Sequence, residues 1–380
     1  IDMTSSNMLM RDPVIYRVLN KPHHRTGKKW KVYPMYDWTH GESDYIEKVS
    51  HSLCTLEFKP HRDLYDWFLK AIPTEDIIPC QTEFARLNLS YTVTSKRKLK
   101  ELVDNNFVKG WDDPRMPTIS GLRRRGYTPE SLRKFVDIAG IAKRENVIEV
   151  SLLEFCIRDH LNKIAPRVNA VLDPIKLTIT NYDKKEENLL GEINPEQKQL
   201  GNRKIPFSKR LFIERQDFKE EANRKFFRLT LGQEVRLKSA YIIKAHKVLK
   251  DDKGEIKEVL CTYDKDSKSG SNTEASKRKV KGTIHWVSQD HAVEAKINIY
   301  DRLFLDPAPD QHKEKNFIDF INPNSLQVKT AKIEPSIMNA KIGDSYQFQR
   351  IGYFNVDFDS KNSNLVFNKT VGLRDSWIKK

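Results

Sequence analysis

The sequence has few cysteines and no long hydrophobic run. Its four cysteines are Cys54, Cys80, Cys156 and Cys261, and none of them belongs to a C-x-x-C pair. Neither a zinc site nor a disulfide framework is therefore predicted, and we expect reduced thiols. No apolar run approaches the roughly 18 residues of a membrane span, and no signal peptide opens the chain, so we expect a soluble, cytoplasmic protein.

Basic residues outnumber acidic residues. The 380 residues include 67 Lys+Arg and 52 Asp+Glu, which gives a net charge of +15. This surplus favours a polyanionic partner, and ribosomal RNA, tRNA and DNA are all allowed. The chain is long enough for two to four domains, because single cores rarely grow much beyond about 250 residues.

The first 88 residues are predicted to mix strands and helices. Residues 14–18 and 30–33 alternate in a strand-like way and flank a basic loop. The following elements are predicted as a helix, a strand and an amphipathic helix: residues 43–51, residues 53–58 and a segment with Leu64, Trp67, Phe68 and Ile72 on one face. This order is expected of the later half of an open nucleotide-binding sheet.

The chain is predicted to be helical from residue 98 and β-rich from residue 166. Thr128 and Pro129 indicate a helix start, and Ser151 opens a capping-box helix. Residues 264–281 are expected to be the least ordered, because they are polar and poor in apolar side chains. An antiparallel barrel or sandwich is predicted from the alternating segments 176–180, 210–214, 234–238, 241–244, 283–287 and 295–300.

A cationic run occupies residues 90–99, with the sequence SYTVTSKRKL. It places Ser, Lys, Arg and Lys in succession between the apolar Val93 and Leu99, where mobile cationic donors could hold a phosphate. A solvated basic loop is the alternative interpretation of the charges alone. The run is followed by residues 111–118 (WDDPRMPT) and 121–126 (GLRRRG).

Taken together, these segments resemble the second nucleotide-binding motif of the class I aminoacyl-tRNA synthetases, in the glutaminyl and glutamyl branch. The resemblance extends from residue 10 to residue 375. It implies a multi-domain α/β plus all-β protein, whose expected parts follow the chain: the tail of an acceptor-stem-binding insertion (1–35), the second half of a Rossmann-type nucleotide-binding catalytic fold with the cationic loop (36–97), a helical connector (98–164) and two anticodon-binding β-barrels (165–380).

The resemblance implies ATP, accompanied by Mg²⁺, as the nucleotide. Lys96, assisted by Ser95, is expected to be catalytic, because fixed cations stabilise charge on the displaced phosphates. Thr94 stands where the family usually has Met, which leaves the cation in place. No protein metal ligand is implied, and the expected ATP contacts are Thr55, Arg86, Leu87, Thr94, Ser95 and Lys96.

The resemblance also places an amino-acid pocket. Tyr36 and Gln81 match glutamine-contacting residues, with His40 and Cys54 nearby. A side-chain amide needs neutral hydrogen-bonding partners, whereas a carboxylate needs a cation. Glutamyl relatives usually carry arginine at the position of Cys54, so Cys54 favours glutamine. Without the family, Tyr36 and Cys54 would be interpreted as core residues.

The implied macromolecular partner is tRNA(Gln), bound by a monomer. Lys225 and Lys238 stand where a bacterial relative has Gln and Arg, so they suit phosphate better than bidentate base reading. Unpaired bases would be gripped by planar and polar side chains. The expected tRNA contacts are Lys143, Arg144, Arg167, Lys225, Arg228, Arg236, Lys238, Gln347, Arg350 and Ser376.

One family motif is missing from the sequence. Class I synthetases carry a His-Ile-Gly-His motif, and nothing like it occurs here. We therefore expect a piece lacking roughly the first third of the parent enzyme and inactive by itself. Two alternatives stay open: a glutamyl-tRNA synthetase, and a non-catalytic RNA-binding module.

Overall fold

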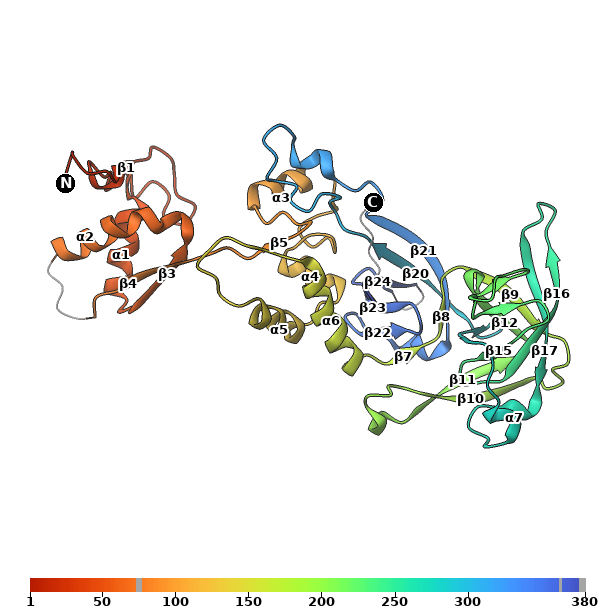
Figure 1. The fold of residues 1–380 in the computed structure, drawn as a ribbon. Coiled ribbons are helices and arrows are strands. Elements are labelled where there is room, and N and C mark those ends of the chain that lie inside the picture. Colours follow the sequence, from red (N-terminus) through yellow and green to blue (C-terminus); the bar gives the residue numbers. More distant parts are fainter. Residues whose placement is uncertain (73–76, 362–363, 376–380) are drawn as a thin grey trace. The chain divides into compact units, whose positions relative to one another are not determined.

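The computed structural model describes residues 1–72, 77–361 and 364–375 (Figure 1). The chain forms two compact units, Ile1–Asn88 with Ala139–Ile148, and Leu89–Ile138 with Glu149–Lys380. Two short strands, β5 (Asn88–Leu89) and β6 (Val147–Ile148), lie where the chain changes unit. In the described part, none of the helices is long and apolar enough to cross a membrane.

The first unit contains a β–α–β crossover. Strands β3 (His51–Thr55) and β4 (Cys80–Phe84) pair in parallel, and helix α2 (Arg62–Ala71) lies between them in sequence. Helix α2 buries an apolar stripe against helix α1 (Tyr36–Ile46), as its periodicity predicts. Strands β1 (Tyr16–Val18) and β2 (Val32–Pro34) form the expected antiparallel pair.

The predicted helix at residues 43–51 is wrong in its position. Helix α1 begins seven residues earlier, at Tyr36, and ends at Ile46, after which Lys48 adopts a left-handed conformation with φ of 59°. The following strand ends at Thr55, and residues Leu56–His61 form a 3₁₀ helix instead of continuing it. Pro60 lies inside that 3₁₀ helix. Because proline has no backbone N–H to donate to a neighbouring strand, it disfavours a longer strand here.

The helices α3 (Lys96–Asp104), α4 (Ile119–Arg125), α5 (Pro129–Ala139) and α6 (Val150–Ile164) form the predicted helical stretch. The expected Pro129 start is confirmed, but the capping box at Ser151 is wrong. Helix α6 is capped at Glu149 instead, and the buried Ser90 hydroxyl accepts the hydrogen of the Val150 amide at 3.1 Å. A residue 60 positions away in the sequence thus replaces the local cap.

Two seven-stranded sheets form the β-rich half of the second unit. The first sheet contains, from edge to edge, β18 (Thr283–Ile284), β15 (Glu234–Leu237), β16 (Ile242–Lys250), β17 (Ile256–Asp264), β9 (Pro174–Ile179), β12 (Arg210–Glu214) and β19 (Val287–Ser288). The second contains β7 (Arg167–Val168), β22 (Ser345–Phe348), β23 (Gly352–Val356), β24 (Leu365–Gly372), β20 (Val293–Tyr300), β21 (Leu326–Ile333) and β8 (Ala170–Val171).

Both sheets are closed in the same way. The two edge strands of the first sheet, β18 and β19, are successive pieces of residues 283–288, and the fully buried Trp286 lies between them. In the second sheet, β7 and β8 are likewise successive, separated only by Asn169. One short stretch of chain therefore joins both edges of each sheet, and the predicted barrels are curled sheets around separate buried cores.

The predicted all-antiparallel pairing is wrong for part of these sheets. Strand β9 runs parallel to β17, and β20 runs parallel to β24. Alternation along a strand shows which face is buried but not the direction of its neighbour. Two shorter pairs complete the region: β10 (Glu186–Glu192) with β11 (Asn202–Ser208), and β13 (Phe218–Lys219) with β14 (Leu229–Thr230).

Residues 264–281 are more ordered than their composition predicts. They contain a 3₁₀ turn at Lys265–Ser267 and the short helix α7 (Glu274–Lys277). The Arg236 guanidinium donates to the carbonyl oxygens of Ser267 at 3.0 Å and Ser276 at 2.8 Å. This segment is therefore organised by a cation from another strand and not by its own apolar content.

Gly126 allows helix α4 to end directly against the second sheet. It has φ of 96°, and a Cβ atom there would lie 2.5 Å from Cβ of Asn355 and 2.7 Å from Oγ1 of Thr370. We predict that Gly126→Ala lowers the free energy of unfolding by about 2–4 kcal/mol, through backbone strain plus the clash. Urea denaturation measures the loss.

Gly343→Ala is the matched control. Gly343 also has positive φ (88°), but a Cβ atom at that position would meet no other atom of the described residues within 4 Å. The substitution should cost only the conformational part, about 1–2 kcal/mol. Equal losses in the two variants would contradict a role for the close approach at Gly126.

Candidate functional site

The cationic loop leads into helix α3. Ser95 is the N-cap residue and Lys96 the first helical residue. Within the described residues, the exposed Lys96 and Arg97 side chains form no hydrogen bond or ion pair. Val93 and Leu99, on either side, are buried. The expected loop position of these cations is therefore wrong: Lys96 and Arg97 extend from the first turn of α3, on a backbone anchored by buried neighbours.

The anchoring core comes largely from the second sheet's long connection between β20 and β21, which lies beside α3 in Figure 1. Leu303, Phe304 and Phe317 from this connection pack with Leu99. The Tyr91 amide donates to the carbonyl oxygen of Pro307 at 2.9 Å. Long-range contacts thus fix a loop that local sequence alone would leave mobile.

The other expected nucleotide contacts belong to the first unit. Thr55 Oγ1 donates to Glu57 Oε1 at 2.9 Å, and Arg86 Nη2 donates to Glu57 Oε2 at 2.8 Å. Leu87 is exposed. One carboxylate therefore brings Thr55 and Arg86 together, and Glu57 is a residue that the sequence motifs did not single out.

The expected amino-acid contacts lie around the start of α1 and the β3–β4 pair. The Tyr36 ring lies tilted against His40 and Phe58, with ring centroids 5.1 and 4.6 Å apart, and burial raises the pKa of its hydroxyl. His40 Nε2 lies 2.9 Å from the Ser52 hydroxyl. Cys54 is partly buried, and burial together with Glu83 raises the pKa of its thiol, so it presents a neutral group.

A buried carboxylate, Glu83, lies beside this group and pairs with the exposed Arg62. Gln81 donates through Nε2 to the carbonyl oxygen of Phe58 at 3.1 Å and to Glu83 Oε1 at 2.9 Å. Arg62 binds both oxygens of Glu83. Burial alone would raise the pKa of Glu83, but Arg62 and Gln81 lower it. Neither Arg62 nor Glu83 was predicted from the sequence. The one sequence signal was that Glu83 is a charged residue at an inward-facing position of a strand.

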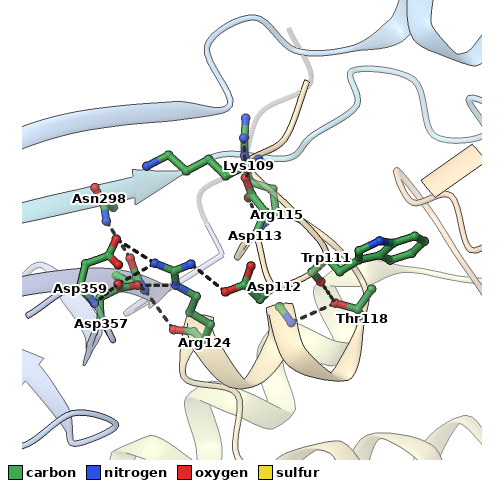
Figure 2. Close-up of polar contacts among 12 residues, drawn as sticks. Lys109, Trp111, Asp112, Asp113, Arg115, Thr118, Arg124, Asn298, Asp357 and Asp359 are labelled. Carbon is green, nitrogen blue, oxygen red and sulfur yellow. Dashed lines mark hydrogen bonds and ion pairs between the residues drawn. The ribbon is translucent and has the colours of Figure 1, made fainter. Parts of the chain in front are cut away.

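The WDDPRMPT segment has a structural role (Figure 2). Asp113 accepts the backbone amides of Lys109 and Arg115 at 2.9 and 3.0 Å and also binds the Arg115 side chain. Thr118 donates from its hydroxyl to the Trp111 carbonyl oxygen and accepts from the Gly121 amide at 3.0 Å. These contacts fold the segment into a compact turn that ends at the N-cap of α4.

Arg124, from the same motif, ties helix α4 to the second sheet (Figure 2). Its Nε and Nη2 atoms donate to the two oxygens of Asp357 at 2.9 and 2.8 Å. It also binds Asp112 and Asp359, each at 2.9 Å. Burial by itself would raise the pKa of Asp357, but the Arg124 guanidinium and the Asp359 amide lower it.

A cavity of about 700 Å³ lies between the two sheets and the end of α6. Four expected RNA contacts line it together: Arg167, Arg236, Lys238 and Gln347. Arg167 donates to the oxygens of Asn162 and Arg236 to carbonyl oxygens, so neutral acceptors hold both guanidiniums. Their positive charge is left available to an anionic or acceptor-rich ligand.

Burial and neighbouring charges act on the cations of this cavity. The pKa of Lys238 is lowered mainly by burial and further by the positive charge of Arg203. The pKa of Arg236 is lowered in the same way, by burial and then by the charge of Arg278. The Gln347 amide donates to the Tyr353 hydroxyl at 2.8 Å, which fixes its orientation. Gln349 also lines the cavity and was not among the expected contacts, although it stands two residues from Gln347.

The remaining expected RNA contacts lie elsewhere. Lys143 and Arg144 are exposed in the first unit, and Lys143 Nζ lies 5.8 Å from the Phe84 ring centroid. Lys225 is exposed, while Arg228 and Arg350 both bind Asp217. Ser376 lies outside the described residues.

Three family models match the chain. They are described as the catalytic domain of class I (E and Q) tRNA synthetases, matching residues 1–163, and as two anticodon-binding domains of the same synthetases, matching residues 165–264 and 283–357. The chain belongs to the class I tRNA synthetases for glutamate and glutamine, in the glutamine–tRNA ligase group.

Relatives named glutamine–tRNA ligase are similar over the whole chain. Those of Rhodopirellula baltica and Vibrio vulnificus are 54% and 56% identical and align with 100% of this chain. The chain spans 63% and 68% of their respective lengths. A third, from Proteus mirabilis, is 54% identical, and the chain spans 67% of it.

The Arg124–Asp357 contact predicts acid sensitivity. Folding lowers the pKa of Asp357 below the value of about 4 that it has in the unfolded chain. The contact therefore stabilises the folded protein fully at pH values well above about 4. This stabilisation is lost as the pH falls through the lower pKa of the folded state. At pH 7, Asp357→Asn should lower the free energy of unfolding by about 3–5 kcal/mol, because the largely buried Arg124 guanidinium loses its main carboxylate partner. Denaturant titrations measure the free energy of unfolding of both proteins at pH 7 and pH 3. The difference between the variant and the unmodified protein should be smaller at pH 3.

Asp359→Asn provides the control, because Asp359 binds the same arginine but its side chain is 65% exposed. It should cost less than about 1 kcal/mol. A loss independent of pH in Asp357→Asn would contradict the ionic contribution.

Proposed function

We propose that the protein containing this chain is a glutamine–tRNA ligase that activates glutamine with ATP and transfers it to tRNA(Gln). The observation that carries the proposal is Lys96, a free ammonium at the start of α3 on a backbone fixed by a buried core. A fixed cation without a carboxylate partner is suited to stabilise a polyphosphate.

In the first step, a glutamine carboxylate oxygen would attack the α-phosphorus of ATP, and the bond to the β-phosphate oxygen would break. Pyrophosphate would leave with Mg²⁺, and Lys96 would neutralise the developing charge, supported by Ser95 and Thr94. Thr55, Arg86 and Leu87 would contact the nucleotide. In the second step, a hydroxyl of the terminal tRNA ribose would attack the activated carbonyl, and AMP would leave.

The preference for glutamine over glutamate is supported by the lack of a free cation at Cys54. Arg62, at the start of α2, is a cation that acts on Cys54, and both oxygens of Glu83 hold it. It would therefore be unavailable to a γ-carboxylate, whereas Tyr36, His40, Cys54 and Gln81 offer neutral contacts to an amide. We propose that a monomer acts in the cytoplasm.

The cavity supports anticodon-loop binding. Arg167, Arg236, Lys238 and Gln347 would hold unpaired bases or their phosphates there, and Arg228, Arg350 and Lys225 would contact the same loop outside the cavity. Lys143 and Arg144 would meet the tRNA elsewhere. The cavity also favours a second candidate, RNA binding without catalysis by the chain itself.

Amino-acid-dependent pyrophosphate exchange, run with tRNA present, tests the proposed reaction. We expect the full gene product to exchange with glutamine and at least about a hundredfold less efficiently with glutamate, because burying an unpaired carboxylate is costly. The control is the same assay without tRNA. Preferential exchange with glutamate would overturn the substrate, and no exchange with either amino acid would favour the RNA-binding candidate.

Lys96→Ala tests the role of the loop in the same gene product. Removing a preorganised charge should slow adenylate formation by about 10²–10³-fold while tRNA affinity changes less than about threefold. Lys100→Ala removes an equal charge from the same helix, where Lys100 pairs with the exposed Asp104, and should leave both unchanged. Equal losses of rate and affinity in Lys96→Ala would indicate an RNA contact instead.

A further inference from the structure

Asp217 is a buried carboxylate that binds two arginines. It lies in a 3₁₀ turn of the first sheet's chain and is 0% exposed. Its Oδ1 atom accepts from Arg350 Nη2 at 2.8 Å and lies 3.1 Å from Arg228 Nε. Its other oxygen binds Arg350 Nη1. A single negative charge therefore serves two guanidiniums.

The two arginines come from distant parts of the second unit. Arg228 immediately precedes β14, next to the first sheet, whereas Arg350 lies in the turn between β22 and β23 of the second. Arg350 has φ of 67°, a left-handed conformation that costs a non-glycine residue about 1–2 kcal/mol. The contacts of its side chain with Asp217 compensate for this strain and join the two sheets at one point.

Among the described residues, each guanidinium keeps an edge without a partner. Arg350 Nη1 also donates to His285 Nδ1 at 3.0 Å, so three of its five N–H groups are engaged. Arg228 donates from Nη1 to the Gln216 carbonyl oxygen at 3.1 Å and keeps three N–H groups. The Arg228 and Arg350 side chains are 39% and 29% exposed, so their remaining donors can reach a ligand.

Two consecutive aromatic residues, Phe226 and Phe227, precede Arg228 in the chain. Phe227 is 63% exposed, and Phe226 lies 5.8 Å from the Arg228 guanidinium. Lys225 is exposed on the same segment. A ring beside cationic donors is the combination that binds an unpaired base, by stacking on its face and hydrogen bonding to its edge.

We propose that Asp217 is a positioning residue for base recognition. It orients Arg228 and Arg350 so that their free edges receive one unpaired base of the anticodon loop, next to the Phe226 ring that lies 5.8 Å from the Arg228 guanidinium. The base is one that presents acceptor atoms on its edge. This inference rests on the proposed tRNA function. Without the carboxylate, the two guanidiniums would repel each other and lose their common orientation.

Asp217→Asn in the full gene product tests this role, because asparagine keeps the size and one acceptor. Equilibrium binding is measured for tRNA(Gln) and for transcripts with one anticodon base replaced at a time. We expect discrimination to fall about tenfold or more at one anticodon position and to persist at the others. Affinity for the replaced transcripts should hold or rise, since a negative charge has been removed.

Asp290→Asn is the matched control: it removes the same charge from an exposed pair with Arg210 in the same sheet's chain. It should leave discrimination unchanged. Unchanged discrimination in Asp217→Asn would overturn the positioning role. If the unmodified protein itself ignores the anticodon, the proposed function fails, which is a different result.

Arg228→Lys and Arg350→Lys keep the test decisive if Asp217→Asn fails to fold. Lysine retains the charge but not the planar fork. Both variants should lose discrimination at the same anticodon position. Losses at two different positions would overturn a shared reading site organised by Asp217.

Discussion

Buried contacts between arginine and carboxylate groups hold the second unit together. Arg124 with Asp357 joins a helix to the second sheet, and Arg350 with Asp217 joins the two sheets. Arg203 with Glu334 joins the β10–β11 pair to the second sheet, and Glu334 also accepts the Asn169 amide at 2.9 Å. An ion removed from water requires its partner and its hydrogen bonds, so such contacts permit few alternative arrangements.

These contacts also organise the candidate site. Because Arg124 fixes helix α4 on the second sheet, the chain between α3 and α4 has a defined end, and the long β20–β21 connection can pack under the cationic loop. Lys96 and Arg97 then stay exposed without an ion pair among the described residues, Lys98 pairs with Asp310, and the apolar Val93 and Leu99 are buried. The same separation recurs in the cavity, where Arg167 and Arg236 are held by neutral oxygens. The proposed base-reading arginines Arg228 and Arg350 differ, because they share the carboxylate of Asp217.

Elements with a strong local pattern were predictable. The α2 stripe, the Pro129 start of α5 and the strand Arg210–Glu214 follow from side-chain periodicity and capping chemistry. Helix α1 and the cap of α6 were misplaced, because tertiary contacts chose the boundaries: Ser90 replaced the local cap of α6. The order of residues 264–281 was underestimated for a related reason. Arg236 holds their backbone carbonyl oxygens, and amino-acid composition does not reveal such contacts.

By itself, the sequence determined the basic charge, the helical and β-rich segments, the cationic loop and, through its motifs, the family. Those properties depend on residue type and spacing, which are local. The tertiary structure alone decided that residues 283–288 and 167–171 close the two sheets, that four expected RNA contacts share one cavity, and that Asp217 joins two distant arginines. Each of these depends on strand direction and on contacts between remote residues, which side-chain alternation does not encode.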